Sequence, residues 1–180
     1  LLDISRLESG RFAMRKERFE LCALVQTLAD VYNVRASEKG LHLRLQSQVG
    51  APCWVKGDPV RLRQVLHNLL GNAVKFTQQG SVTLTLHRDP DSGLLSAEVQ
   101  DTGPGINAAD LPRVFEAFHQ VGVDAGTPTE GTGLGLTIAR DIAQGMGGDI
   151  AMTSTVGVGT TALFTALLPA AEATPEVAAQ

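Results

Sequence analysis

Residues 94–105 read Leu-Leu-Ser-Ala-Glu-Val-Gln-Asp-Thr-Gly-Pro-Gly, which indicates a β-strand that ends in a glycine-rich turn. Apolar and polar side chains alternate, and Asp101 has the parity of Leu95, Ala97 and Val99. Because successive strand residues point to opposite faces, the Asp101 carboxylate should lie on the apolar face of a sheet. A carboxylate there is costly unless a donor meets it. The glycines that follow allow a flat ligand to come close, so the stretch predicts the floor of a binding pocket.

Helical and strand periodicities alternate on both sides of this stretch. The spacing of apolar residues predicts helices over residues 20–37, 58–76 and 134–146, and a short helix from Asn107 to Phe118. Asp58 and Pro59 are suited to cap the second helix. Alternation predicts strands over residues 41–46, 53–56, 82–86, 94–101, 149–154 and 160–168. With a hairpin at residues 82–101, this order favours an α/β two-layer sandwich whose sheet carries helices on one face.

The composition is that of a globular domain, with 43% apolar residues, 19% charged residues and a net charge of −4. This balance gives no indication of direct nucleic-acid binding. No apolar run approaches the roughly 18–20 residues of a membrane span. The two cysteines and four histidines lack the spacing of a metal site. Since the chain begins with Leu1 instead of methionine, we expect it to be a piece of a longer protein.

The predicted helix at 58–76 carries a polar stripe beside its apolar one. Asn68 and Asn72 are four residues apart and Lys75 follows three later, so all three project from one side. An asparagine carbonyl oxygen can coordinate Mg²⁺ without adding charge, and a lysine can neutralise phosphate oxygens. The alternative is an ordinary solvated face.

A second glycine-rich stretch, Gly131-Thr132-Gly133-Leu134-Gly135, leads directly into the predicted helix at 134–146. Backbone N–H groups and the helix dipole at such a position can hold an anion, although glycine-rich loops before helices also occur without this role. The spacing is neither that of a Walker A loop nor that of a dinucleotide fingerprint. Together with Asp101 and the polar stripe formed by Asn68, Asn72 and Lys75, which we call the asparagine stripe, it indicates a nucleotide site covered by the long segment 102–135.

These motifs, in this order, resemble those of the ATP-binding domain of bacterial sensor histidine kinases, within the superfamily of gyrase, heat-shock chaperone, histidine kinase and MutL ATPases. Residues 68–77 match the N box, 101–106 the G1 box, 115–118 the F box and 131–136 the G2 box, while 157–160 resemble the closing box. Residues 1–10 resemble the end of the second helix of a dimerisation and phosphoacceptor domain.

The resemblance implies a Bergerat fold, which is a mixed, mostly antiparallel sheet with helices on one face and a long ATP lid. It implies four segments: the end of the dimerisation helix at residues 1–10, a connector at 11–19, the ATP-binding catalytic domain at 20–169, and a tail at 170–180.

The resemblance also implies ATP and Mg²⁺ as cofactors. Asn72 would be the Mg²⁺ ligand, Asn68 and Lys75 would serve catalysis beside the phosphates, and Asp101 would accept from the adenine N6 amine. The other residues expected to contact or enclose the nucleotide are Gly103, Gly105, Ile106, Phe115, Phe118, Gly131, Thr132, Gly133, Leu134, Gly135, Leu136 and Thr160.

The predicted function is that of the catalytic part of a protein-histidine kinase, which would transfer the ATP γ-phosphate to a histidine upstream of Leu1 for relay to the receiver domain of a response regulator. Hydrolytic relatives place a glutamate where this chain has Asn68, and asparagine cannot accept a proton as a general base. The full-length protein would be a homodimer in the bacterial inner membrane, with this domain in the cytoplasm. The alternative is a nucleotide-gated interaction module or degenerate kinase without transfer, because residues 114–139 contain no lysine or arginine.

Overall fold

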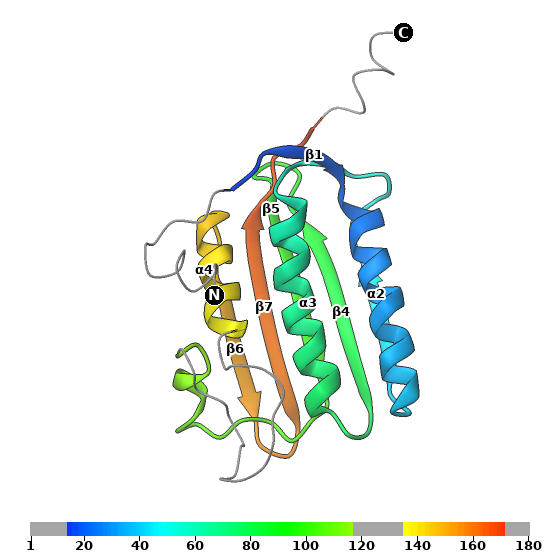
Figure 1. Cartoon of the computed structure of the whole chain (residues 1–180), viewed down its shortest axis with the longest axis vertical. Coiled ribbons are helices and arrows are strands. Elements are labelled where there is room, and N and C mark those ends of the chain that lie inside the picture. Colours follow the sequence, from blue (N-terminus) through cyan, green and yellow to red (C-terminus); the bar gives the residue numbers. More distant parts are fainter. Residues whose placement is uncertain (1–13, 117–134, 172–180) are drawn as a thin grey trace, which may run out of the picture.

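Helices cover one face of a five-stranded sheet in the computed structural model, which describes residues 14–116 and 135–171 (Figure 1). In chain order the elements are β1 (Glu17–Glu20), α2 (Leu21–Glu38), β2 (His42–Ser47), β3 (Trp54–Gly57), α3 (Pro59–Phe76), β4 (Ser81–Arg88), β5 (Leu94–Asp101), the 3₁₀ helix η1 (Leu111–Arg113), α4 (Gly135–Gly145), β6 (Ile150–Thr155) and β7 (Gly159–Leu167).

The strand order of the main sheet is β2-β4-β5-β7-β6. β2 runs parallel to β4, and the other neighbouring pairs are antiparallel. α2, α3 and α4 lie side by side across the same face of this sheet (Figure 1). The prediction of a mixed, mostly antiparallel sheet with helices on one face is therefore confirmed, and β5, which ends in Asp101, lies in its centre.

The core lies between this sheet and the three helices. Leu84 and Leu86 on β4, Leu95 on β5 and Phe164 on β7 are at most 1% exposed, and Leu66 of α3 packs against them from the helical layer. Each fully buried side chain of this size contributes about 1.5–3 kcal/mol of hydrophobic stabilisation. The alternation that buries Leu95 and its neighbours also sets the direction of Asp101, as the sequence predicts.

The start of α3 confirms the predicted cap. Asp58 is 3% exposed, and its carboxylate accepts from the backbone N–H of Arg61 at 3.1 Å and of Arg15 at 3.0 Å. Pro59 occupies the first helical turn, where no N–H partner is needed. The helix therefore begins at a fixed residue, which sets the rotation of its polar stripe relative to the sheet.

A small second sheet lies at one end of the molecule (Figure 1). β1 pairs antiparallel with β3, and the chain beyond β7 returns to the other side of β3 through a bridge between Val55 and Ala170. Lys56 donates its N–H to the carbonyl of Pro169 at 2.8 Å. Local periodicity did not predict this return, because it depends on residues more than a hundred positions apart.

The helix predicted from Asn107 to Phe118 is wrong in its described part. Residues Leu111–Arg113 form only a single 3₁₀ turn, and the Asn107 side chain caps the turn before it, accepting from the N–H of Asp110 at 2.8 Å. Pro112, which has no N–H, does not favour continuation of a regular helix at this point. Phe118, residues 1–10 and residues 131–134 lie outside the described residues. Among the helices that the structure describes, none has the length and apolar character needed to span a bilayer.

Candidate functional site

Asp101 is the last residue of β5, and its two carboxylate oxygens differ in their hydrogen bonds to the described residues. Oδ1 accepts from the backbone N–H of Gly103 at 2.9 Å and of Thr160 at 3.1 Å. No described residue donates to Oδ2. Burial raises the pKa of Asp101, and the two backbone hydrogen bonds offset this only in part. The site therefore contains a half-buried acceptor that is fixed in direction and that receives no hydrogen bond from the described part of the chain.

Thr77 lies beside this carboxylate, although the sequence assigned it no role. Its side chain is fully buried, and Oγ1 has no hydrogen-bond partner among the residues described. A Cβ on Gly103 would lie 3.1 Å from Asp101 Oδ1 and 3.3 Å from Thr77 Oγ1, so the glycine permits this close approach. A buried unpartnered hydroxyl costs about 1–3 kcal/mol and usually has a water or ligand as its partner. The one sequence signal was its place at the end of the N box.

The glycine-rich turn after β5 is held against the turn between β6 and β7. Ile106 donates its N–H to Ser154 Oγ at 2.7 Å, and this hydroxyl is 2.8 Å from Thr160 Oγ1. Gly105 has a φ of +77°, and a Cβ there would overlap the backbone carbonyl of Thr155. The structure thus brings the predicted residues Gly103, Gly105, Ile106 and Thr160 together around Asp101, across 59 positions of sequence.

The predicted polar stripe on α3 is formed as the spacing indicated. Asn72 donates from Nδ2 to Asn68 Oδ1 at 3.4 Å, which leaves Asn72 Oδ1 without a donor among the described residues. Both asparagines are half-buried, whereas Lys75 is exposed one turn further along, with Nζ 5.3 Å from the Phe76 ring centroid. An amide oxygen and an ammonium group therefore lie on the same side of one helix.

α2 supports this part of α3 at two places. The Tyr32 hydroxyl contacts His67 Nδ1 and donates to the His67 carbonyl at 3.1 Å, directly before Asn68. Lys39 Nζ donates to the carbonyls of Val74 at 2.6 Å and Lys75 at 3.1 Å. A cation at the last carbonyls of a helix satisfies acceptors and complements the helix dipole, so the N box is fixed at both ends.

The N-terminus of α4 contacts the polar stripe of α3 at Asn68. Gly135 is the first residue of α4, and a Cβ there would overlap the Asn68 side-chain amide. A side chain at position 135 would therefore displace the Asn68 amide from its place on the stripe. The N–H groups of the first turn of a helix carry a partial positive charge that favours anions. Leu136 and Phe115, two further predicted residues, are half-buried and pack against the core nearby.

A single family covers the part of the chain that holds this site. Residues 57–172 match the family described as histidine kinase-, DNA gyrase B- and HSP90-like ATPase. The chain belongs to this ATPase family. The match includes α3 with its asparagines, Asp101, and α4 with its N-terminus, so each cluster of the candidate site falls within the family's own domain.

Among members of this ATPase family, the chain is similar to sensor proteins of two-component type. It is 42% identical to the virulence sensor protein BvgS of Bordetella bronchiseptica over 99% of this chain and 15% of that protein. It is 39% identical to the autoinducer 2 sensor kinase/phosphatase LuxQ of Vibrio cholerae, over 89% of this chain and 19% of that protein. The chain therefore spans less than a fifth of the length of these two relatives.

The solved structures place the fold in the same group. The crystal structure of full-length ShkA in complex with AMPPNP superposes with a TM-score of 0.82 and 34% identity, over 96% of this chain and 35% of that one. With the relatives above, this similarity shows that the chain is a catalytic ATP-binding domain of the type found in sensor histidine kinases.

Proposed function

We propose that the domain binds Mg²⁺–ATP and holds the γ-phosphate for transfer to a histidine in a domain upstream of Leu1. The observation that carries this proposal is Asp101, whose Oδ1 is saturated by two backbone donors while Oδ2 has no described donor. The adenine N6 amine is a donor of matching chemistry. Thr77 Oγ1 is buried next to it and has no partner within residues 14–116 and 135–171, so it offers a second polar contact in the same floor, directly or through a water.

The asparagine stripe fits the phosphate end of the nucleotide. Asn72 Oδ1 is an oxygen ligand of the kind that Mg²⁺ accepts, and Mg²⁺ is commonly held through few protein ligands together with substrate phosphates. Lys75 and the N-terminus of α4 would place positive charge beside the phosphate oxygens. When bound, the metal and ATP supply charge neutralisation and a transferable phosphoryl group, and the protein supplies alignment.

Asn68 favours transfer over hydrolysis. Its side chain has no ionisable group, so it cannot remove a proton from an attacking water. Instead its Oδ1 accepts from Asn72, and its amide packs against Gly135, which orients the metal ligand and the helix start. A histidine acceptor is itself a nucleophile, so the site needs to position it and does not need to activate a water.

The partners belong to the same proposal. The histidine would come from a dimerisation and phosphoacceptor domain of the same or the paired chain, and the phosphate would pass to a response-regulator receiver domain. We propose that the complete protein is a homodimer of the bacterial inner membrane that presents this domain to the cytoplasm. The names of BvgS, a virulence sensor protein, and LuxQ, a sensor kinase/phosphatase, support a signalling role for the complete protein.

The deciding experiment compares this chain with a longer one that adds the upstream helices. Both are incubated with Mg²⁺ and ATP labelled at the γ-phosphate, and phosphohistidine is detected as acid-labile, base-stable label. We expect label on the longer chain, none on the 180-residue chain, and none on the longer chain carrying Asn72→Ala. ATP binding without label on the longer chain would indicate a nucleotide-gated interaction module, and steady phosphate release would indicate a hydrolytic ATPase.

The affinity for ATP is expected to fall as the pH drops through the raised pKa of Asp101. Only the ionised carboxylate offers Oδ2 as a pure acceptor to the N6 amine. Above that pKa the affinity should be constant, and below it the dissociation constant should rise about tenfold per pH unit as one proton competes with the ligand. Titration with a fluorescent ATP analogue across the acidic and neutral range measures this profile. Asp101→Asn should lack this titration, and a flat profile in the parent chain would contradict the role given to Oδ2.

A further inference from the structure

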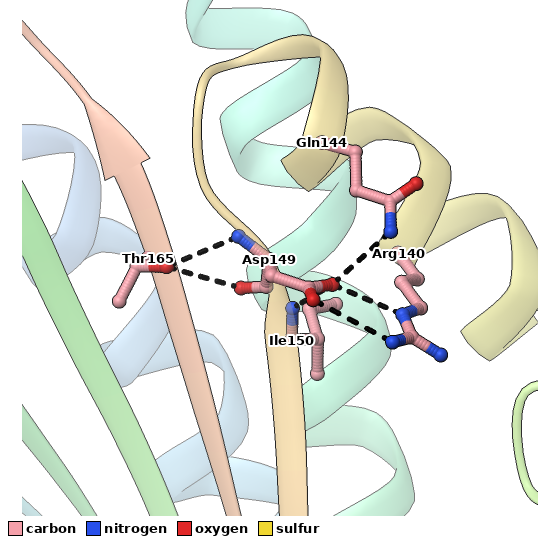
Figure 2. Close-up of polar contacts among 5 residues, drawn as sticks. All are labelled: Arg140, Gln144, Asp149, Ile150 and Thr165. Carbon is pink, nitrogen blue, oxygen red and sulfur yellow. Dashed lines mark hydrogen bonds and ion pairs between the residues drawn. The ribbon is translucent and has the colours of Figure 1, made fainter.

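Arg140, on α4, lies between an aromatic ring and a carboxylate that belong to different parts of the fold. Its Nε donates to Asp149 Oδ1 at 3.0 Å and its second terminal nitrogen to Oδ2 at 3.5 Å (Figure 2). Its Cζ lies 4.6 Å from the centroid of the Phe115 ring. A guanidinium can form a fork with a carboxylate and interact with an aromatic face at the same time.

Asp149 is itself fixed to the main sheet. Its Oδ1 accepts from the N–H of Ile150 at 2.8 Å, and its own N–H donates to Thr165 Oγ1 on β7 at 3.0 Å (Figure 2). Gln144 adds a further donor at 3.4 Å. The hydrogen bond from Arg140 is the main reason why the pKa of Asp149 lies below its ordinary value. The guanidinium is therefore held by a carboxylate that is hydrogen-bonded to the start of β6, on a residue whose backbone is hydrogen-bonded to β7.

Phe115 is held by α4 at a second point. Thr137 Oγ1 donates to the Phe115 carbonyl at 2.7 Å, one helical turn before Arg140. Thr137 and Arg140 are three residues apart and so lie on the same side of the helix. We call Phe115, Thr137, Arg140 and Asp149 the Arg140 cluster. It joins the F box, the first half of α4 and the edge of the sheet.

The Arg140 cluster acts on the region where α4 meets the N box. Gly135 packs without a side chain against the Asn68 amide, so a small shift of α4 changes this contact directly. Arg140 is five residues after Gly135, which is a rise of about 7.5 Å along the helix axis at 1.5 Å per residue. A guanidinium fixed at that distance restrains both the translation and the rotation of the first turn.

We propose that Arg140 is a positioning residue of the nucleotide site, which holds the N-terminus of α4 against Asn68 through its contacts with Phe115 and Asp149. Arg140 does not touch the nucleotide in this scheme. The proposal rests on the proposed function, because the site it positions is the ATP site. Its distinctive claim is that nucleotide affinity depends on the cation over the Phe115 ring, whereas a half-exposed ion pair contributes little to the stability of a fold.

The test measures the affinity of the 180-residue chain for Mg²⁺–AMPPNP by calorimetry. Arg140→Ala is expected to weaken binding about three- to tenfold. Arg140→Lys, which keeps a cation over the ring, should recover affinity to within about twofold of the parent chain. Arg113→Ala is the matched control. Arg113 lies two residues before Phe115 and forms an exposed ion pair with Glu116, so its removal should leave the affinity unchanged. The melting temperature of each variant is recorded alongside.

A double-mutant cycle tests whether Arg140 affects the nucleotide affinity through its contact with Phe115. Phe115→Leu and Arg140→Ala should be non-additive in affinity, because removal of either partner abolishes the same contact. Equal affinity of Arg140→Ala and the parent chain would overturn the proposal, and so would simple multiplication of the two effects. Should Arg140→Ala fail to fold, Arg140→Gln, which removes the cation and keeps a polar side chain, provides the same comparison in milder form. Absence of AMPPNP binding by the parent chain would instead count against the proposed function.

Discussion

Asp101→Asn is expected to weaken ATP binding by about 100-fold or more while the fold survives. The backbone N–H groups of Gly103 and Thr160 both point at Oδ1, so an asparagine must keep its carbonyl oxygen there. Its amide nitrogen then takes the place of Oδ2 and presents a donor to the N6 amine, which is also a donor. The loss combines a missing charge-assisted hydrogen bond with two donors left without acceptors.

Stability separates this effect from a folding defect. Burial disfavours the charged form of Asp101, so the carboxylate lowers the stability of the fold at neutral pH, and this cost disappears as the pH falls through its raised pKa. A neutral amide avoids the cost, so the free energy of unfolding of Asp101→Asn should equal or exceed that of the parent chain. Calorimetric titration with ATP and urea unfolding measure the two quantities. Asp141→Asn is the matched control, because Asp141 is also half-buried with a pKa raised by burial and lies outside the proposed site. Parent-like ATP affinity in Asp101→Asn would show that Asp101 does not read the adenine.

Asn72→Ala is expected to remove the dependence of ATP affinity on Mg²⁺ and to lower transfer in the longer chain by about 100-fold or more. Asn72 Oδ1 is the described side-chain oxygen on the stripe that has no donor, whereas Asn68 Oδ1 already accepts from Asn72. Without Asn72, a divalent ion would be held by phosphate oxygens and water alone.

Titrations with ATP in the presence and absence of Mg²⁺ measure how far the ATP affinity depends on the metal. The parent chain should bind ATP more tightly with Mg²⁺, and Asn72→Ala should show the same weaker affinity in both conditions. Asn33→Ala, an exposed asparagine on α2, controls for the substitution itself. If Asn72→Ala keeps the full Mg²⁺ effect, the metal is held by other groups and the assignment of Asn72 is wrong.

Much of the fold could be predicted because local patterns dominate it. Parity along residues 94–101 set the inward direction of Asp101, and the Asp58 cap set the start of α3, and both are confirmed. The predicted helix from Asn107 was wrong because Leu111, Val114 and Phe115 have helical spacing over too short a stretch, in which Pro112 removes a donor. Helical spacing of apolar residues does not show whether a segment can form enough backbone hydrogen bonds to make a helix.

The site could be predicted as a set of residues but not as a set of contacts. Nothing local in the sequence indicates that Thr160 donates to Asp101 or that Gly135 excludes a side chain next to Asn68. Arg140 carried no signal, and Thr77 carried only its place at the end of the N box, because the neighbours of both residues are supplied by distant segments. The role of each predicted site residue stays a prediction until the variants above are measured.

The small sheet around β3 determines how the domain would respond to mechanical force. β1 and residues 169–171 flank β3 on opposite sides, and both run antiparallel to it. The incoming chain meets β3 at Gly57, and the outgoing chain leaves it beside Trp54, where Ala171 donates to the Trp54 carbonyl at 2.9 Å. Tension between the two ends would therefore load both ladders in shear, with their hydrogen bonds strained together and not one after another. Such a force would also act on the start of α3, because Arg15, which precedes β1, donates its N–H to the Asp58 cap at 3.0 Å.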